Sequence, residues 1–293
     1  MPANRLSLTG VICVAFAISC GSSVPSDTTG MVLISAGEFT MGTNDGFPYE
    51  GPPHQVTLSS FYLDEHEVTN AQYLEFAKST GYATDSEKLG WSGIFDPKQE
   101  SWTKGDGADW RHPDGPGSSH EAKPDYPVIH LSWQDAASYC EWKGLRLPTE
   151  AEFEYAIRGG LDGAQFPWGN ELTPGGVHRA NLWQGRFPNQ DLHHDGFASY
   201  GPIKQFPPNA YGVYDITGNV WEWVADWYSP TYFQSSPSRD PQGPETGTQK
   251  VQRGGSWLCS ENYCQGFRAA ARMMTEPDSG LNNLGFRCAA NGE

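Results

Sequence analysis

The sequence predicts a single α+β domain that is rich in loops and built from short helices and strands. Its 293 residues include 34 glycines and 22 prolines, which interrupt long helices at this density. The 11 tryptophans, 13 tyrosines and 14 phenylalanines can nevertheless fill a core. Because no internal repeat, low-complexity tract or linker-like stretch follows residue 31, we expect one domain over residues 31–293.

Residues 1–19 have the pattern of a signal peptide. Arg5 precedes an apolar run from Leu6 to Ile18, which is short for a membrane span. The run ends in the letters AISC, which resemble a bacterial lipoprotein cleavage site and would leave Cys20 as the acylated N-terminus. Residues 20–30 then form a tether to the cell envelope, and the lipid is the expected membrane contact. The alternative is ordinary secretion, with Cys20 discarded or unused.

The first part of the domain predicts strands followed by a helix. Met31–Gly42 alternates as a β-hairpin would, with Gly37 in its turn, and Phe61–Val68 is another strand-like run. Thr69–Gln72 forms a capping box, and the apolar spacing after it predicts a helix with one buried face.

Two further helices are expected in the middle of the chain. Ser132–Asp135 begins one that carries Cys140. Thr149–Glu152 begins another, and Gly159 and Gly160 end it. We interpret all three helices as scaffold.

The net charge of −16 bears on possible partners. An acidic surface repels phosphate backbones, so we do not expect nucleic acid to bind. The sequence contains no His-Glu-x-x-His zinc motif and no phosphate-binding glycine loop. We expect a monomer.

The cysteines allow several pairings. There are six, and removal of the signal peptide together with acylation of Cys20 would leave Cys140, Cys259, Cys264 and Cys288. Four cysteines allow three pairings, and in an exported protein two structural disulfides are a simple possibility.

Two segments near the C-terminus identify a family resemblance. Gly254–Cys264 (GGSWLCSENYC) holds two cysteines five residues apart, and Asn283–Cys288 (NLGFRC) follows it. The chain resembles the formylglycine-generating enzymes, or sulfatase-modifying factors, from about Met31 to Ala290. Three more segments match the family: Trp110–Pro116, Pro127–Trp133 and Arg146–Glu152. The resemblance implies the fold of these enzymes, within the C-type-lectin-like superfamily.

The resemblance implies that the cysteines have separate roles. Cys140 and Cys288 would form a disulfide, while Cys259 and Cys264 would form the active site. Two thiolates make a soft site that selects Cu(I), and Cu(I) accepts low coordination. The implied reaction uses copper and O2 to oxidise the cysteine of a sulfatase Cys-x-Pro-x-Arg motif to formylglycine. Without copper, the pair could close as a disulfide.

Further site residues follow from the resemblance. The expected active-site positions are Ser256, Tyr263, Asn283 and Trp221; their alternative role is turn capping and core packing. The arginine of the substrate motif would meet Glu67 and Trp91. Trp91 stands where the family often has Asp, so a cation–π contact would replace a charge-assisted bond. Ser260 stands where the family often has His, and Met273 and Met274 lie in a segment that is usually polar.

Two structural calcium sites are also implied by the resemblance. Calcium prefers six to eight hard oxygen ligands. The residue spacing alone favours solvated loop carboxylates, because it is not that of an EF-hand. The family's sites map onto Asn181, Leu182, Asp195 and Phe197, and onto Asp215, Gly218, Val220 and Glu222.

We therefore expect an oxidoreductase that activates sulfatases. One alternative is an envelope lipoprotein that uses the same fold for binding or assembly, and another is an oxidase for a different thiol or peptide. The cysteine pair favours the enzyme over the binding protein.

Overall fold

The computed structural model describes residues 27–96 and 99–292 and has the predicted α+β architecture with short elements. Within these described ranges the α-helices are α1 (Asn70–Thr80), α2 (Asp85–Leu89), α3 (Trp133–Trp142) and α4 (Glu150–Arg158). The strands are β1 (Met31–Ile34), β2 (Gly37–Met41), β3 (His54–Leu58), β4 (Phe61–Asp64), β5 (Trp91–Asp96), β6 (Ser101–Asp106), β7 (Trp221–Trp227), β8 (Lys250–Arg253), β9 (Arg272–Thr275), β10 (Leu284–Phe286) and β11 (Ala289–Asn291). Short 3-10 turns occupy Pro48–Glu50, His120–Ala122, Pro174–Gly176 and Tyr232–Gln234.

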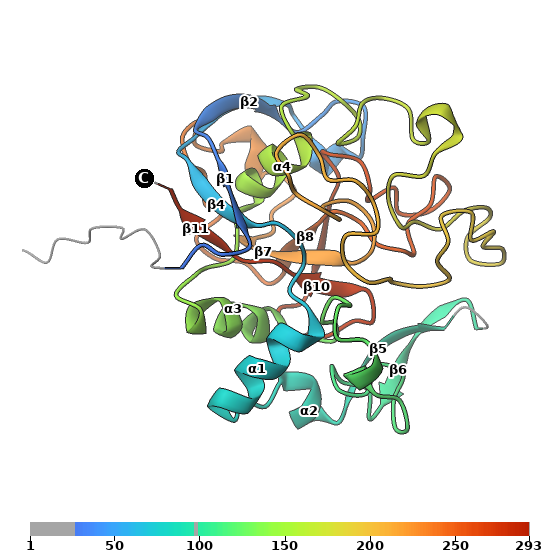
Figure 1. The fold of residues 1–293 in the computed structure, drawn as a ribbon. Coiled ribbons are helices and arrows are strands. Elements are labelled where there is room, and N and C mark those ends of the chain that lie inside the picture. Colours follow the sequence, from blue (N-terminus) through green and yellow to red (C-terminus); the bar gives the residue numbers. More distant parts are fainter. Residues whose placement is uncertain (1–26, 97–98, 293) are drawn as a thin grey trace, which may run out of the picture.

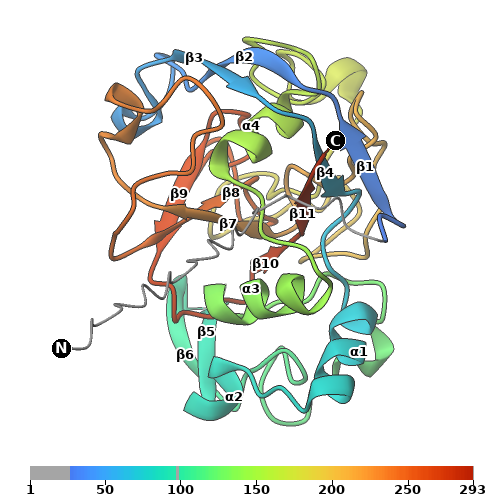
Figure 2. The ribbon, with the colours of Figure 1, turned by 90° about the vertical axis from the view of Figure 1, so that its left-hand side faces the viewer.

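The elements are arranged in two parts around a small central sheet. Helices α1, α2 and α3 lie with the β5–β6 hairpin in the lower part of Figure 1, whereas α4 lies with the N-terminal strands in the upper part. The view from the side keeps this division, with β7 and β8 between the two parts (Figure 2). Long loops make up much of the remaining chain.

Sheet pairing joins segments that are distant in sequence. The central sheet has the order β10-β7-β8-β9, in which β10 runs parallel to β7 and the other pairs are antiparallel. A second, antiparallel sheet has the order β1-β4-β11, so the C-terminal strand closes against the N-terminal ones. The register pairs Trp223 with both Phe286 and Gln252, and Gln252 with Met273.

The predicted helix starts are present. Thr69 caps α1 and forms a capping box with Gln72. Thr149 caps α4 in the same way, and Gly159 ends that helix with φ of 54°. Ser132 caps α3, which carries Cys140. These ends are local features, because a side-chain oxygen satisfies free backbone N–H groups of its own first turn.

The predicted hairpin over Met31–Gly42 is wrong. Strands β1 and β2 both form, but β1 pairs with β4 and β2 pairs with β3. Gly37 begins β2 instead of forming a turn. A Cβ at this position would collide with the hydroxyl of Tyr155, so close packing explains the glycine. The predicted strand Phe61–Val68 is present as the shorter β4.

The sequence reasoning missed α2 and the hairpin that follows it. Helix α2 begins with a capping box between Thr84 and Glu87 and ends at Gly90, with φ of 72°. Strands β5 and β6 then pair in register from Trp91 opposite Asp106 to Asp96 opposite Ser101. The capping signal was visible in the sequence, but the helix is only five residues long.

The main core is aromatic and includes the first disulfide. Tyr73, Tyr139 and Phe286 contact one another with ring centroids 5.4–6.5 Å apart. The Cys140–Cys288 disulfide that the resemblance implies is present in the same cluster, with a Cα–Cα distance of 5.7 Å. It links α3 to the segment between β10 and β11 and closes 148 residues of chain.

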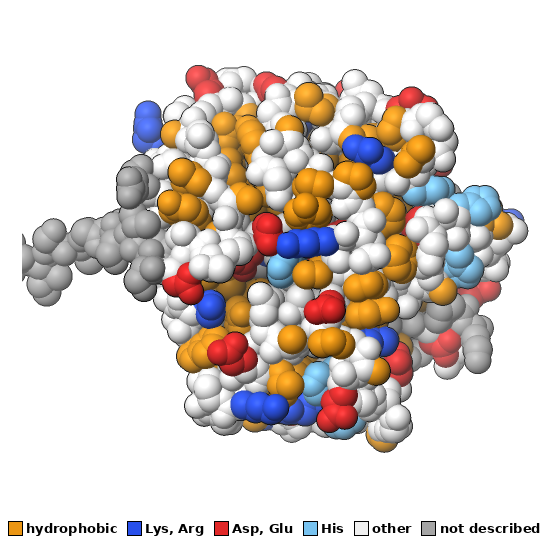
Figure 3. Space-filling model, viewed as in Figure 1, with side chains coloured by type: hydrophobic (Ala, Val, Ile, Leu, Met, Phe, Trp, Pro, Cys, Tyr) orange, Lys and Arg blue, Asp and Glu red, His pale blue; other side chains and the backbone are white. Residues whose placement is uncertain are grey.

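Between residues 27 and 292, apart from 97 and 98, no helix combines the length and apolar character needed to cross a bilayer. The predicted signal peptide, residues 1–19, and the predicted acylation site Cys20 lie outside the described residues. On the face shown in Figure 3, basic side chains are scattered among acidic, apolar and neutral ones.

Candidate active site

The cysteine pair lies in a loop that a buried arginine holds at both ends. Arg253 is the last residue of β8, and its guanidinium is completely buried between Glu150 and Glu154 of α4. The same guanidinium donates to the carbonyls of Ala269 and Ala270, at 3.1 Å each. Because Arg253 precedes the loop and the two alanines follow the cysteines, the network holds the start of the loop near its end.

The Gly-Gly turn is required by close backbone packing. Gly254 and Gly255 have φ of 92° and 77°, in the left-handed region that favours glycine. A Cβ at Gly255 would lie 2.7 Å from backbone atoms of Gly266 and Phe267. The turn therefore brings the chain before the first cysteine against the chain after the second.

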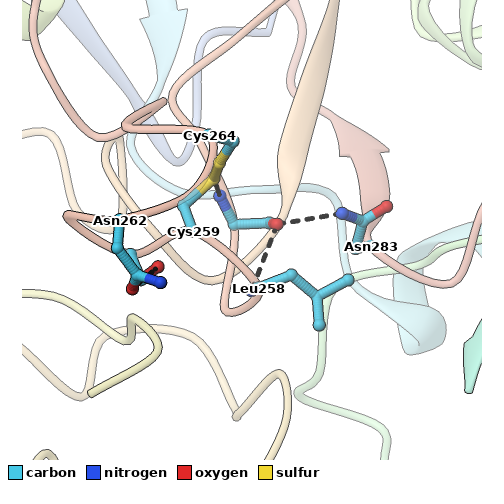
Figure 4. Close-up of a disulfide and its surroundings, with 7 residues drawn as sticks. Leu258, Cys259, Asn262, Cys264 and Asn283 are labelled. Carbon is cyan, nitrogen blue, oxygen red and sulfur yellow. Dashed lines mark hydrogen bonds between the residues drawn. A yellow bond between two sulfur atoms is a disulfide. The ribbon is translucent and has the colours of Figure 1, made fainter. Parts of the chain in front are cut away.

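Cys259 and Cys264 are joined in a disulfide, with a Cα–Cα distance of 5.2 Å (Figure 4). Cys259 is completely buried, and its carbonyl accepts a hydrogen bond of 3.0 Å from the N–H of Trp183. Cys264 is only partly buried. The two thiols can thus meet, and one of them is nearer to solvent.

Ser256 and Asn283 form a hydrogen-bonded pair beside the disulfide. The Asn283 amide donates to Ser256 Oγ at 2.9 Å, and the N–H of Leu258 donates to the same oxygen at 3.4 Å (Figure 4). The N–H of Ser256 contacts Cys259 Sγ at 3.4 Å. Asn283 Oδ1 is buried and has no hydrogen-bond partner within the described part of the chain. Asn283 Oδ1 is thus, among these residues, an unsatisfied acceptor beside the cysteine pair.

All the predicted catalytic residues line one cavity of about 270 Å³: Cys259, Cys264, Ser256, Tyr263, Trp221 and Asn283. Trp221 lines this cavity and also packs in the main core. Tyr263 is 45% exposed and lies at the rim. The structure thus brings together side chains from β7, from the cysteine loop and from the segment before β10.

The cavity has further lining residues that sequence reasoning did not assign. They are mostly apolar and include Trp102, Met273 and Leu281, with the buried amide of Gln252. Met273 lies in the segment that departs from the family's polar pattern, which was a visible signal. Trp102 comes from the β5–β6 hairpin, and only the fold places it here.

Comparison with known proteins identifies the family. A model of the sulfatase-modifying factor enzyme 1-like domain matches residues 20–292. The chain belongs to this family. It is 50% identical to the formylglycine-generating enzyme of Thermomonospora curvata, over 89% of this chain and 93% of the relative. It is 47% identical to the formylglycine-generating enzyme of Bos taurus, over 91% of this chain and 76% of the relative.

Similar proteins also include one that is named as inactive. The chain is 43% identical to a Mus musculus protein named inactive C-alpha-formylglycine-generating enzyme 2, over 89% of this chain and 85% of the relative. Among solved structures, PvdO from Pseudomonas aeruginosa superposes with a TM-score of 0.69 at 29% identity, covering 89% of this chain and 94% of that one. Membership in the sulfatase-modifying factor family therefore establishes the fold, and the site must decide the activity.

The two residues predicted to bind the substrate arginine lie apart from the cysteine cavity. Glu67 is completely buried, and its Oε1 accepts a bond of 3.1 Å from Asn219. Trp91 begins β5, with the Lys104 ammonium 5.3 Å from its ring centroid. Neither is among the described residues that line the cavity. Their role in substrate binding stays a prediction.

At the first predicted calcium site, the oxygens of Leu182 and Asp195 converge. Asp195 Oδ2 and the Leu182 carbonyl both accept from the side-chain amide of Gln184. The Asp195 carboxylate also accepts the N–H of Phe197 at 3.0 Å. The Asn181 amide donates to the carbonyl of Ser199 at 2.9 Å. Two of the four predicted ligands therefore present oxygen to one point, which the Gln184 amide nitrogen occupies, and calcium binding here stays a prediction.

The second predicted calcium site is a buried carboxylate cluster. Glu222 is bound through both oxygens by Arg287, at 2.7 Å each, and Asp215 accepts the N–H of Lys204 at 2.5 Å. Burial raises the pKa of Glu67 well above its usual range, and the negative charges of Asp215 and Glu222 add to this rise. Glu67 Oε2 is buried without a partner among the described residues.

This excess of buried negative charge fits a cation near the predicted site. However, the described side chains include no group of three or more His, Cys, Asp or Glu residues arranged to hold a metal ion. Calcium binding here would depend on backbone carbonyls, and the predicted carbonyl donors are Gly218 and Val220.

Proposed function

We propose that this chain is an oxidoreductase that activates sulfatases by converting the cysteine of a Cys-x-Pro-x-Arg motif to formylglycine. The observation that supports this most directly is the Cys259–Cys264 pair at the wall of one cavity. Family similarity gives the reaction class, since relatives at 47–50% identity are named formylglycine-generating enzyme. Because another relative is named inactive, the cysteine pair carries the assignment of activity.

The overall reaction has a definite electron balance. In the net reaction, the thiol-bearing carbon of the substrate becomes an aldehyde, its sulfur leaves as hydrogen sulfide, and O2 is reduced with the formation of one water molecule. This balance requires two electrons and two protons in addition to the substrate, for which an external thiol is a suitable source. The same thiol can reduce the Cys259–Cys264 disulfide to the dithiol.

The donor set at the cavity fits Cu(I). Two thiolates from Cys259 and Cys264 would hold the ion, since soft sulfur ligands select Cu(I) over hard cations. When bound, copper would supply the redox chemistry that activates O2 for oxidation of the substrate cysteine. Ser256 and Asn283 have a separate task, which is to orient polar groups beside the cysteines through the bonds described above.

The cavity wall has a role in binding the substrate peptide. Trp221 and Tyr263 present aromatic surface, and Asn283 Oδ1 can accept a hydrogen bond from a peptide N–H. Burying the peptide against these groups would exclude water from the reacting sulfur. Glu67 and Trp91 remain the proposed contacts for the arginine of the motif.

Calcium and the cell envelope complete the proposal. Two calcium ions would hold irregular backbone in place, with Asp195 at one site and Asp215 with Glu222 at the other. The predicted signal peptide, residues 1–19, precedes the region that the family model matches. We propose an exported protein with a lipid on Cys20, acting as a monomer.

The decisive experiment is mass spectrometry of a Cys-x-Pro-x-Arg peptide incubated with the reduced protein, copper, O2 and a thiol reductant. The expected product has lost sulfur and reacts with an aldehyde-specific hydrazide. The same peptide with Ser in place of Cys should remain unchanged. An unmodified Cys peptide, with wild-type protein shown to be folded, would contradict the enzyme and favour a binding protein of the same fold.

A further inference from the structure

The segment that carries Cys264 has little support from the core. Glu261, Asn262 and Tyr263 are all exposed, whereas Cys259 on the other side of the segment is completely buried. When the disulfide is reduced, the distance between the two sulfur atoms therefore depends on the contacts that hold this exposed segment. Its side chains meet a second loop, which contains Phe187.

The ring of Phe187 stacks on that of Tyr263. Their centroids are 3.9 Å apart and their planes differ by 12°. On its other sides, Phe187 contacts Trp183 and Phe95, each with a centroid distance of 5.1 Å. The partly buried Phe187 thus connects an exposed aromatic ring to rings that are buried.

The buried side of this connection reaches the neighbour of the first cysteine. Trp183 and Phe95 belong to a core cluster that also contains Leu258, which directly precedes Cys259. Tyr263 directly precedes Cys264. The Phe187 side chain therefore packs on Tyr263, which precedes Cys264, and on the core cluster that contains Leu258, which precedes Cys259.

Asn262 adds a polar clamp between the same two loops. Its amide nitrogen donates to the carbonyl of Phe187, and its oxygen accepts the N–H of Phe187, both at 3.4 Å. The Ser260 hydroxyl also donates to Asn262 Oδ1, at 2.9 Å (Figure 4). The clamp fixes the backbone of the loop whose ring supports Tyr263.

We propose that Phe187, with Asn262, is a positioning residue that holds Cys264 against Cys259 and fixes the ring of Tyr263 at the rim of the cavity. Without the stacked ring, the exposed segment gains conformational freedom, and the two thiols spend less time within reach of each other. This inference extends the proposed function to a residue outside the cavity, but its physical basis is the cysteine pair itself.

The reduction potential of the Cys259–Cys264 disulfide reports this effect directly. Reduction consumes two electrons and two protons, supplied by two glutathione molecules that become one glutathione disulfide. A looser pair has a lower effective concentration of one thiol near the other, so the disulfide is reduced more easily. A tenfold fall in effective concentration corresponds to a potential about 30 mV less negative.

The experiment is a redox titration of the mature protein in glutathione buffers, read by alkylation and mass spectrometry of the peptides that contain Cys259 and Cys264. Phe187→Ala should make the potential less negative by about 30 mV, a tenfold change in equilibrium constant. Asn262→Ala, at an exposed position, should shift it in the same direction by less. Phe187→Tyr keeps the stacked ring and should restore the wild-type potential.

The matched control is Trp142→Ala, which removes a partly exposed aromatic side chain that packs on Phe76 and Tyr139 in α1 and α3. It should leave the potential unchanged. A wild-type potential in both Phe187→Ala and Asn262→Ala would overturn the proposal, and so would an equal shift in Trp142→Ala.

Peptide oxidation separates this inference from the proposed function. If wild-type protein oxidises the Cys peptide, Phe187→Ala should lower kcat while Phe187→Tyr retains it. If wild-type protein does not oxidise the peptide but Phe187→Ala still shifts the potential, the proposed function fails and the positioning role stands. If wild-type protein oxidises the peptide but Phe187→Ala does not shift the potential, the proposed function stands and the positioning role fails.

Discussion

Arg253 and Glu154 form a completely buried ion pair, with Nη2 and Oε2 2.5 Å apart, between the strand that leads into the cysteine loop and helix α4. Burial by itself would raise the pKa of Glu154, but Arg253, Arg158 and the Gly42 N–H together lower it below its usual value. Glu154 also accepts the N–H of Gly42 at 2.7 Å. The cysteine loop is thus tied through one guanidinium to both a helix and the segment that follows the N-terminal strand β2.

Replacement of Arg253 by Met should therefore destabilise the whole domain. It would leave Glu154 and Glu150 buried with one fewer counter-charge, which typically costs about 3–5 kcal/mol. Chemical denaturation monitored by fluorescence would measure the free energy of unfolding. Arg146→Met, which breaks a partly exposed pair with Glu152, should cost much less. Equal losses of unfolding free energy in the two variants would contradict a stabilising role for the buried pairs of Arg253 with Glu150 and Glu154.

The two disulfides should have different effects on stability. Replacing Cys140 and Cys288 by Ala removes the link that closes a loop of 148 residues. The chain-entropy estimate puts the resulting loss in the free energy of unfolding at about 5 kcal/mol. Cys264→Ser opens a loop of only five residues, so the protein should still fold. The same substitution removes one thiol of the proposed active site, so it should abolish peptide oxidation. Thermal unfolding followed by circular dichroism, together with the peptide assay, would test both. Unfolding of Cys264→Ser at ambient temperature would contradict this division of roles.

Asn283 should matter for binding the substrate peptide. Its free Oδ1 faces no partner among the described residues, so a bound peptide N–H can use it. Asn283→Leu removes that acceptor and the donor to Ser256, and each lost bond is worth about 1–1.5 kcal/mol. We expect kcat/KM for the Cys peptide to fall by at least tenfold. Steady-state kinetics at varied peptide concentration would show it, and unchanged kcat/KM would exclude Asn283 from the site.

Calcium removal should lower the stability of the protein. A ligand that binds only the folded state adds about 2.7 kcal/mol when its concentration is 100 times its Kd. We expect EGTA to lower Tm and calcium, but not magnesium, to restore it. Asp195→Asn should reduce the response to calcium, because Asp195 presents oxygen at the first site. A Tm that is the same with EGTA and with calcium would contradict both proposed ions.

Asp226 should make stability depend on pH. Burial raises the pKa of Asp226 to about 8, and the negative charge of Glu150 adds to the effect. The unfolded side chain has a pKa of about 3.9, so between roughly pH 4 and 8 the folded state holds the extra proton. Stability from this group is therefore complete below about pH 4 and is lost as pH rises toward 8.

Asp226→Asn removes this titration while keeping an oxygen that can accept the N–H of Glu150. The expected result is a flatter dependence of the unfolding free energy on pH between 6 and 8, measured by urea titration. One group can contribute at most about 1.4 kcal/mol per pH unit. Asp106→Asn, at a side chain that is 85% exposed, should follow wild type. Parallel curves for wild type and Asp226→Asn would contradict the prediction.

Helix starts and the candidate site were largely readable from the sequence. Thr69 and Thr149 begin helices through bonds within their own first turns, so a four-residue pattern contains the necessary information. The cysteine motif led to Cys259, Cys264 and Ser256 through family resemblance, and these residues share one cavity. The β5–β6 hairpin was missed, although it supplies Trp102 to that cavity.

The sequence by itself determined where helices α1, α3 and α4 begin, the family, and the residues around the cysteine pair. Only the tertiary structure decided that β1 pairs with β4 instead of β2, that Arg253 ties the loop to α4, and that Phe187 supports Tyr263. The physical reason is the separation along the chain over which each feature acts. A cap or a motif acts within a few residues, whereas these three relationships join residues that are far apart along the chain: Met31 with Asp64, Glu154 with Arg253, and Phe187 with Tyr263. Only the folded chain brings such residues into contact.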